Sequence, residues 1–288
     1  MMREHCKTGI SSRHFLAPLI ATRKVAPDHY RLTFLEPNVA AQARAGQFMH
    51  ILPRRNETLD PFLRRAFSIV SCHEETFDVL FRVMGRGTQA MSKWKIGEKV
   101  DLLGPLGQAF QPIKGASLLV GGGVGVPPLA MLAAQNRYSK NQGVTALIGA
   151  RSSNEIICED DFAQYKIPVH VATDDGSRGY KGFVTDLLEI QLAQLTQSKV
   201  EPGDQVPMIY ACGPLPMLRL VAQICARYQA PCQISLEENM PCGIGVCNGC
   251  VVPIMNAVDD YGHYRRICID GPVAWAHEIE WNHWETQL

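Results

Sequence analysis

The sequence lacks an excess of charge of either sign. Its 288 residues include 28 basic and 28 acidic side chains, so the formal net charge is zero. Proteins that bind nucleic acid usually offer a basic surface to the phosphate backbone, and this chain has no net charge to provide one. The balance therefore argues against nucleic acid as a partner.

An export signal and a convincing membrane span are also missing. The only apolar stretch near the N-terminus, residues 15–21, is broken by Pro18 and is too short for a signal core. Residues 115–136 carry no charge and are long enough to cross a bilayer. Their glycine cluster and the pair Pro127-Pro128 would, however, leave backbone groups unsatisfied in lipid. We therefore expect a cytoplasmic protein with no membrane span.

The length and the rhythm of apolar residues predict two domains and a small appendage. Short apolar runs between turn signals predict a small antiparallel barrel, with one short helix at residues 87–94. From residue 117 strands alternate with helices, which predicts a parallel sheet with helices on both faces. The predicted barrel strands are residues 20–25, 29–34, 47–52, 67–71, 76–83 and 99–103; the sheet strands are 117–120, 144–149, 169–173 and 208–212; the helices are 127–137, 183–195 and 214–228.

The chain from residue 231 onward is rich in cysteine and glycine and ends in a predicted hairpin. Its arms are residues 251–254 and 265–269, with the turn at residues 259–262. The fold class is therefore β plus α/β multidomain. We predict a barrel at residues 12–112, a parallel-sheet nucleotide-binding domain at 113–230 and a small C-terminal domain at 231–288.

The sequence contains ten cysteines. A disulfide-dense scaffold does not explain them, because such scaffolds are usually short and secreted. Cys242, Cys247 and Cys250 form C-x4-C-x2-C, and 17 residues separate Cys250 from Cys268. This is the plant-type ferredoxin spacing for a [2Fe–2S] cluster, with the fourth ligand arriving from a hairpin arm. A zinc site and inert buried thiols are the alternatives. The remaining cysteines have no ligand-like spacing and are expected to be small buried hydrophobes.

Two glycine-containing motifs predict a dinucleotide site in the α/β region. Gly121, Gly122, Gly123 and Gly125 follow a strand and open a helix, where unpaired N–H groups can meet a phosphate. The motif is not G-x-G-x-x-G, so a tight structural turn is the alternative. Cys212-Gly213-Pro214 ends another strand, at the sheet edge where open α/β sheets bind ligands. Taken alone, that cysteine would be read as a core residue.

Two runs in the barrel region predict a second cofactor site. Arg65-Ala66-Phe67-Ser68 offers an arginine that can pair bidentately with a pyrophosphate. The backbone and hydroxyl around Gly87 and Thr88 are suited to the same group. A charged strand edge and a simple turn are the alternatives for these two runs.

In this order the motifs resemble the ferredoxin–NAD(P) reductase superfamily. The sequence is most similar to the electron-transfer subunit family of dihydroorotate dehydrogenase B, at residues 121–129, 171–188, 235–250 and 268–273. The resemblance implies an FAD barrel, an NAD lobe and a [2Fe–2S] domain. It implies that Arg65 binds the FAD pyrophosphate, that Ser68 lies near the isoalloxazine and that Cys212 lies near the nicotinamide. Phe67 departs from the superfamily's tyrosine, so stacking on the flavin is kept and a hydroxyl contact is lost.

The same resemblance implies a partner subunit and a direction of electron flow. An FMN-containing subunit would oxidise dihydroorotate, in a heterotetramer with two copies of each subunit, and electrons would pass through the cluster and FAD to NAD⁺. No serine or histidine constellation is evident, and His50 is expected to be an ordinary structural residue. Three alternatives remain: the same cofactors serving a sulfide dehydrogenase or glutamate synthase-like partner, a stand-alone NAD(P)H reductase, and a zinc-binding interaction module. Arg151-Ser152 after the second parallel strand leaves NADP possible.

Overall fold

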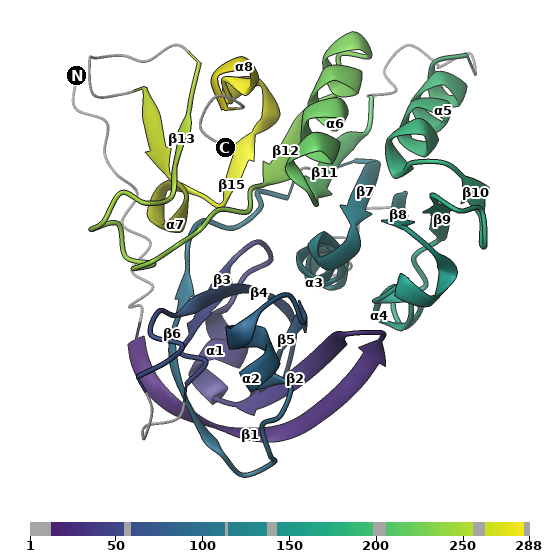
Figure 1. Ribbon diagram of the computed structural model, residues 1–288. Helices are drawn as coiled ribbons and strands as arrows, with labels where there is room; N and C mark the ends of the chain where they lie inside the picture. The colour runs from purple at the N-terminus through teal and green to yellow at the C-terminus, as the bar shows by residue number, and fades with distance from the viewer. Residues whose placement is uncertain are drawn as a thin grey trace.

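The computed structural model describes residues 13–54, 59–112, 115–136, 143–197, 206–255 and 263–284. A barrel, an α/β sheet and a small cysteine-containing part follow one another along the chain (Figure 1). This is the predicted fold class.

The first part is a closed barrel of six antiparallel strands in the order β1-β2-β5-β4-β3-β6. β1 begins earlier than predicted, because it pairs with β6 from Arg13 to Pro18 and with β2 from Leu19 to Ala26. Side chains that point inward, such as Leu32, Phe34 and Phe77, are fully buried. The elements are β1 (Arg13–Ala26), β2 (His29–Leu35), α1 (Pro37–Gln42), β3 (Phe48–Ile51), β4 (Arg65–His73), β5 (Thr76–Arg82), α2 (Arg86–Met91) and β6 (Lys99–Leu106).

The second part is a sheet in the order β10-β9-β8-β7-β11-β12-β15, parallel except for the last strand. Alternate residues of its strands face opposite cores: Leu119 and Tyr210 pack toward the barrel, and Leu118 and Ile209 pack toward α5 and α6. The strands are β7 (Ser117–Gly122), β8 (Val144–Ala150), β9 (Val169–Thr173), β10 (Tyr180–Lys181), β11 (Met208–Cys212), β12 (Cys232–Ser235) and β15 (Val273–Trp275). The helices are α3 (Val126–Asn136), α4 (Glu159–Ala163), α5 (Val184–Gln197) and α6 (Leu215–Arg227).

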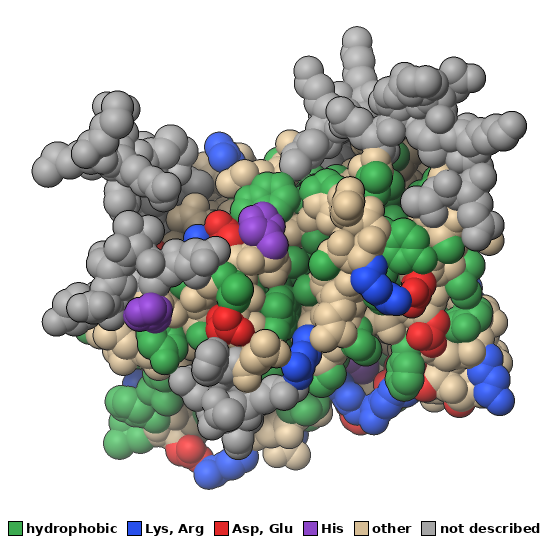
Figure 2. All heavy atoms as spheres, turned by 90° about the horizontal axis from the view of Figure 1, so that it is seen from above, with side chains coloured by type: hydrophobic (Ala, Val, Ile, Leu, Met, Phe, Trp, Pro, Cys, Tyr) green, Lys and Arg blue, Asp and Glu red, His purple; other side chains and the backbone are tan. Residues whose placement is uncertain are grey.

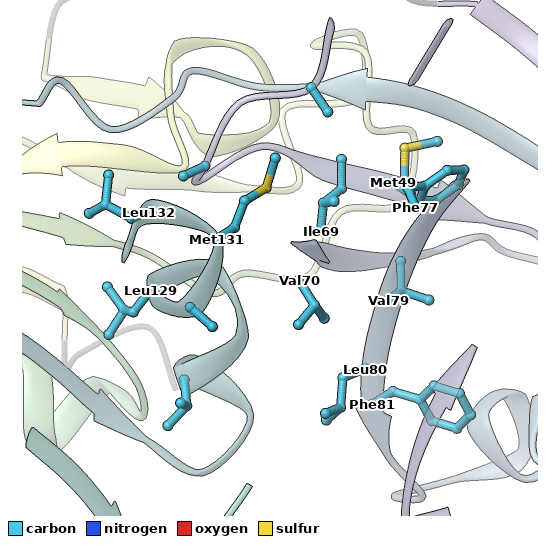
Figure 3. Packing of buried hydrophobic residues seen from close by; sticks show 14 of the residues in the cluster. Met49, Ile69, Val70, Phe77, Val79, Leu80, Phe81, Leu129, Met131 and Leu132 are labelled. Atoms are coloured by element: carbon cyan, nitrogen blue, oxygen red, sulfur yellow. The ribbon is translucent and has the colours of Figure 1, made fainter. Parts of the chain in front are cut away.

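Helix α3 joins the sheet to the barrel. Figure 3 shows Leu129, Met131 and Leu132 of α3 on one side, with Ile69 and Val70 of β4 opposite them. All of these side chains are buried. Each contributes about 1.5–3 kcal/mol by leaving water, so the contact holds the barrel and the sheet in a fixed relation.

The third part differs from the sequence prediction in two respects. The hairpin of β13 (Val251–Pro253) and β14 (Tyr264–Arg266) forms, with the predicted turn outside the described residues. However, residues 267–270 form the short helix α7 (Ile267–Asp270), so Cys268 lies on a helical turn and not on a hairpin arm. The Asp270 carboxylate accepts hydrogen bonds from the N–H and the guanidinium of Arg266, which closes that turn. The chain continues into α8 (Trp281–Trp284).

The second difference concerns the predicted boundary at residue 231. β12, which begins at Cys232, pairs in parallel with β11, and β15 pairs with β12. Both strands therefore extend the nucleotide-binding sheet, and the cysteine loop is an insertion between them. Sequence patterning could not show this, because the run Cys232–Ser235 is short and buried all along its length.

No helix within the described residues is long and apolar enough to cross a membrane. The uncharged segment instead forms β7, a 3₁₀ turn η1 (Gly123–Gly125) and α3. On the face seen in Figure 2, the described basic and acidic side chains are interspersed and do not gather by sign.

Candidate functional site

A cleft of about 1150 Å³ opens between the barrel and the carboxyl edge of the parallel sheet. It brings together strand β4, the start of α2, the turn after β7, the end of β11 and the segment that leads to the first cysteine of the motif. All but one of the predicted FAD and NAD residues line it, namely Arg65, Ala66, Phe67, Ser68, Gly87, Thr88, Gly122, Gly123, Gly125, Cys212 and Gly213.

Two neighbouring arginines at the start of β4 have different surroundings. Arg64 is directed to the barrel, where its guanidinium donates to the Asp101 carboxylate at 2.7 Å and to the carbonyl of His50 at 3.3 Å. Arg65 is exposed at the cleft and, among the described residues, its side chain donates to the backbone carbonyls of Leu63, at 2.8 Å, and Arg64. Arg65 is thus the arginine placed for an anionic ligand.

Gly87 lies beside Arg65, as one shared pyrophosphate site requires. A β-carbon on Gly87 would be 3.5 Å from Nε of Arg65. The Thr88 hydroxyl is already used, because it accepts from the N–H groups of Met84 and Gly85 and donates to the carbonyl of Gly85. The backbone N–H groups of the first turn of α2 are therefore better placed to meet the ligand than this hydroxyl.

The glycines after β7 serve two different purposes. A β-carbon on Gly121 would be 2.8 Å from the Val126 side chain, and one on Gly125 would overlap the backbone of Cys212 and Gly213. These glycines let the turn pack against α3 and against the end of β11. Gly123 has φ of +52° and open space around it, so its backbone is exposed to the cleft. Gly121 is the one predicted cofactor-binding residue that does not line the cleft, because it faces the Val126 side chain of α3.

The Cys212 thiol is held neutral at the floor of the cleft. Burial raises its pKa to about 12, and the charge of Glu237 adds to the effect, while a hydrogen bond with Ser235 opposes it. Burial also raises the pKa of Glu237. Sequence reasoning missed Glu237, because it follows β12, a strand that was not predicted and whose carboxyl end lies beside that of β11.

Arg151, at the end of β8, is engaged by an acidic neighbour. Its guanidinium donates to both carboxylate oxygens of Glu155, at 2.9 and 2.6 Å. These hydrogen bonds and the charge of Glu155, together with the charge of Asp174, raise the pKa of Arg151. All three side chains line the cleft.

The four cysteines of the motif lie around one loop, with backbone N–H groups directed at their sulfurs. The N–H of Gly245 donates to Sγ of Cys268 at 3.2 Å, and that of Gly249 donates to Sγ of Cys247 at 3.4 Å. The N–H of Cys268 donates to Sγ of Cys250 at 3.4 Å. Such donors stabilise thiolates and are typical of iron–sulfur sites.

The cysteines associate as two pairs. Burial opposes ionisation of Cys242, but N–H groups of its loop and the Cys247 side chain outweigh it and lower the pKa to about 6. Burial and the adjacent Cys250 side chain raise the pKa of Cys268 to about 12. Within the described part of the chain, no three His, Cys, Asp or Glu side chains converge as ligands of one metal ion. Two pairs suit a two-iron cluster better than a tetrahedral zinc site.

The other described cysteines lie away from this loop. Cys225 and Cys232 are buried, Cys72 and Cys158 are half-buried, and Cys6 lies outside the described residues. Burial raises the pKa of Cys72 to about 12. They remain without a proposed role.

Known proteins match these parts of the chain. Residues 237–280 match a model of the iron–sulfur cluster binding domain of dihydroorotate dehydrogenase B, and residues 119–223 match an oxidoreductase NAD-binding domain. The dihydroorotate dehydrogenase B (NAD(+)) electron transfer subunit of Desulforamulus reducens is 37% identical over 276 residues, covering 94% of this chain and 99% of that protein. The protein of the same name from Bacillus mycoides is 38% identical, covering 88% of this chain and 94% of that protein. The chain belongs to the dihydroorotate dehydrogenase B electron transfer subunit family.

A solved structure agrees with this placement. One chain of an NADH-dependent reduced ferredoxin–NADP oxidoreductase, described in terms of flavin-based electron bifurcation, has a TM-score of 0.79 and 28% identity. The match covers 95% of this chain and 92% of that chain. The predicted family, fold class and cofactor set of FAD, [2Fe–2S] and NAD are confirmed. This member of the dihydroorotate dehydrogenase B electron transfer subunit family is thus an NAD-linked oxidoreductase subunit.

Proposed function

We propose that this chain carries electrons from a dihydroorotate-oxidising FMN partner subunit to NAD⁺. A bound flavin supplies the exchange between single electrons and hydride that neither the cluster nor NAD can perform alone. One observation carries the proposal: a single cleft joins the flavin motif to the nicotinamide loops and extends to Pro241, next to the first cysteine of the motif. The curated relatives are named as electron transfer subunits, which supports a separate dehydrogenase partner.

The residues divide by cofactor. Arg65, Gly87 and the first turn of α2 would bind the FAD pyrophosphate, with Ala66, Phe67 and Ser68 along the flavin. Gly122, Gly123, Gly125, Cys212 and Gly213 would hold NAD, and Gly121 would support their loop. A neutral thiol is not the nucleophilic form of cysteine, so Cys212 could lie beside the nicotinamide without attacking its ring.

The cysteine pairs suggest how the cluster is held. Cys242 and Cys247 would bind one iron, and Cys250 and Cys268 would bind the other. The first pair is the more accessible one, because Cys242 is half-buried and Cys247 is exposed, whereas Cys250 and Cys268 are both buried. The cluster would therefore sit at the edge of the protein, with the Cys242 and Cys247 side toward the surface. An edge position suits exchange of electrons with a second subunit.

We also propose NAD rather than NADP as the dinucleotide. A 2′-phosphate at the end of β8 would need a basic side chain, and the one there, Arg151, is bound to Glu155. Two further assignments rest on the sequence and the family alone: the assembly of two copies of each subunit, and the cytoplasmic location.

The partner proposal is tested by co-purifying the chain from native cells and assaying the complex. We expect an FMN-containing subunit and NAD⁺ reduction that depends on dihydroorotate. A stable flavin-containing partner that does not oxidise dihydroorotate would favour the sulfide dehydrogenase or glutamate synthase-like alternatives.

The cluster proposal is tested with Cys247→Ser in the full chain. We expect iron and sulfide to be lost while FAD is retained, because Cys247 lies outside the flavin motif. Cys72→Ser is the matched control and should keep both cofactors. Full iron and sulfide content in Cys247→Ser would contradict the ligand assignment.

A further inference from the structure

His50 lies between the two predicted cofactor sites. It belongs to β3, and its backbone pairs with Ala66 of the flavin motif in β4. Its side chain is fully buried, and Nε2 is 2.8 Å from the carbonyl oxygen of Met240, two residues before Cys242. The residue therefore connects the strand beside the flavin motif to the loop that holds the first cluster cysteine.

The geometry fixes the state of the ring. A carbonyl oxygen can only accept, so Nε2 carries the hydrogen and Nδ1 presents a lone pair. Among the described residues Nδ1 has no hydrogen-bond partner. Burial lowers the pKa of His50 to about 4, with Arg64 and Arg65 acting in the same direction against the hydrogen bond to Met240. The ring is thus a neutral donor of one hydrogen bond.

The other edge of the ring meets Gly243. A β-carbon there would be 2.5 Å from Nδ1 of His50, and Gly243 has φ of +70°. The ring is therefore held between Met240 and Gly243, which flank the proposed ligand Cys242 along the chain. A buried acceptor with no hydrogen-bond partner lowers the stability of the fold, so the position of this ring is not explained by stability alone.

A second contact fixes the far side of the cysteine loop. The amide side chain of Gln108 donates to the carbonyl of Ile269 at 3.0 Å, next to Cys268, and the Gln108 N–H donates to the carbonyl of Gly271 at 2.5 Å. The barrel thus holds the loop at two points, one beside each cysteine pair. Only the point at His50 starts from the strand that neighbours the flavin motif.

We propose that His50 is a positioning residue that holds the Cys242 side of the cluster at a fixed distance and orientation from FAD. The inference rests on the proposed placement of both cofactors. The step concerned, taken in the reverse of the proposed direction, would move one of the two electrons of the reduced flavin to the oxidised cluster, which would then hold one ferric and one ferrous ion, while the second electron would stay on the flavin. NADH supplies the reduced flavin by hydride transfer. Because one-electron transfer slows steeply with separation, a loosened loop slows this step and not the hydride step.

The test compares His50→Leu, His50→Gln and His50→Asn in the full-length chain, purified anaerobically with its cofactors. Glutamine can place an N–H donor near the position of Nε2, whereas asparagine is too short to reach Met240 and leucine has no donor. Flavin and cluster absorbance are followed after rapid mixing with NADH, and the reduced cluster is examined by electron paramagnetic resonance. His170→Gln, at an exposed position of β9, is the matched control.

We expect flavin reduction to stay near the wild-type rate in every variant. Cluster reduction should slow by about ten- to a hundredfold in His50→Leu and His50→Asn, the scale seen when outer partners of metal ligands are removed, with an altered resonance spectrum. His50→Gln should restore most of the rate. Loss of the cluster from His50→Leu but not from His50→Gln would also support the role. Wild-type cluster reduction in both His50→Leu and His50→Asn would overturn it. Absence of FAD or cluster from the wild-type chain would instead refute the proposed function.

Discussion

At the residue scale, the ion pair of Arg151 and Glu155 would, in the proposed NAD site, set the charge that the adenine end of the dinucleotide meets. A 2′-phosphate needs a guanidinium that can donate to it, and the Nε–Nη2 edge of Arg151 is already turned to the Glu155 carboxylate. Asp174, in the same part of the cleft, adds further negative charge. An NAD ribose has no such requirement, because its 2′-hydroxyl is neutral.

Glu155→Gln should therefore shift the preference toward NADPH. Removing the carboxylate charge weakens its hold on Arg151, and we expect kcat/KM for NADPH to rise about tenfold relative to that for NADH, the scale of one charge-assisted contact. The measurement is steady-state reduction of an artificial acceptor with each dinucleotide. Glu159→Gln is the matched control, because Glu159 makes a similar pair with Arg178 outside the cleft lining. An unchanged ratio would refute the specificity proposal.

Residues whose roles depend on local spacing can be predicted from the sequence, and residues whose roles depend on distant partners cannot. The spacing of Cys242, Cys247 and Cys250 is set by the size of the cluster itself, so it can be recognised locally. The position of His50 against the cysteine loop could not be predicted, because its partner Met240 is 190 residues away along the chain. Glu155 belongs to no recognisable motif either, because its proposed effect on dinucleotide preference depends on Arg151 lining the cleft.

At the element scale, the turn η1 depends on how closely it approaches the end of β11. Gly125 sits where any side chain would overlap the carbonyl carbon of Cys212 and the nitrogen of Gly213. Both strands end at the cleft, so this contact sets the distance between the two predicted NAD-binding segments.

Gly125→Ala should destabilise the fold and weaken NADH binding while FAD stays bound. Overpacking of this kind costs about 1–3 kcal/mol and must be relieved by moving one backbone away from the other. Gly123→Ala is the comparison, because a β-carbon at this position has open space around it. The left-handed φ should then lower the stability of this variant by about 1 kcal/mol. Thermal unfolding and the dependence of flavin reduction on NADH concentration measure both effects. Equal unfolding midpoints for Gly125→Ala and the wild-type chain would contradict this reading of the turn.

Elements with strong local signals were predictable, and those defined by their neighbours were not. The barrel strands and helices α3, α5 and α6 follow from apolar periodicity and turn residues. β12 is only four residues long, and its place in the sheet comes from pairing with β11. Helix α7 takes the place of only the last part of a predicted hairpin arm, residues 267–269, because Asp270 closes a turn that apolar patterning cannot show. A short run follows its tertiary partners more than its own propensity.

At the scale of the whole molecule, a buried ion network ties the barrel to the α/β sheet. Arg31 of β2 donates to Asp78 of β5 and, across the boundary, to both carboxylate oxygens of Asp161 in α4, at 2.7 and 2.9 Å. The three side chains are about one-tenth exposed. Burial lowers the pKa of Arg31, but the two carboxylates outweigh it and raise the pKa, so the guanidinium stays charged. Together with α3, this network holds the two walls of the cleft.

Asp161→Asn should therefore destabilise the molecule and slow hydride transfer across the cleft. Removing the Asp161 charge leaves the buried Arg31 with Asp78 as its one carboxylate partner among the described residues, beside the Ser71 hydroxyl, which costs about 3 kcal/mol because the lost charge is not replaced by water. Asp160→Asn, the neighbouring position in α4, is the matched control and should unfold close to the wild-type midpoint. Chemical denaturation measures the first effect, and rapid mixing with NADH measures flavin reduction. If Asp161→Asn lost stability but reduced its flavin at the wild-type rate, the network would stabilise the fold without setting the width of the cleft. If neither changed, the walls would be held by the apolar contact of α3 alone.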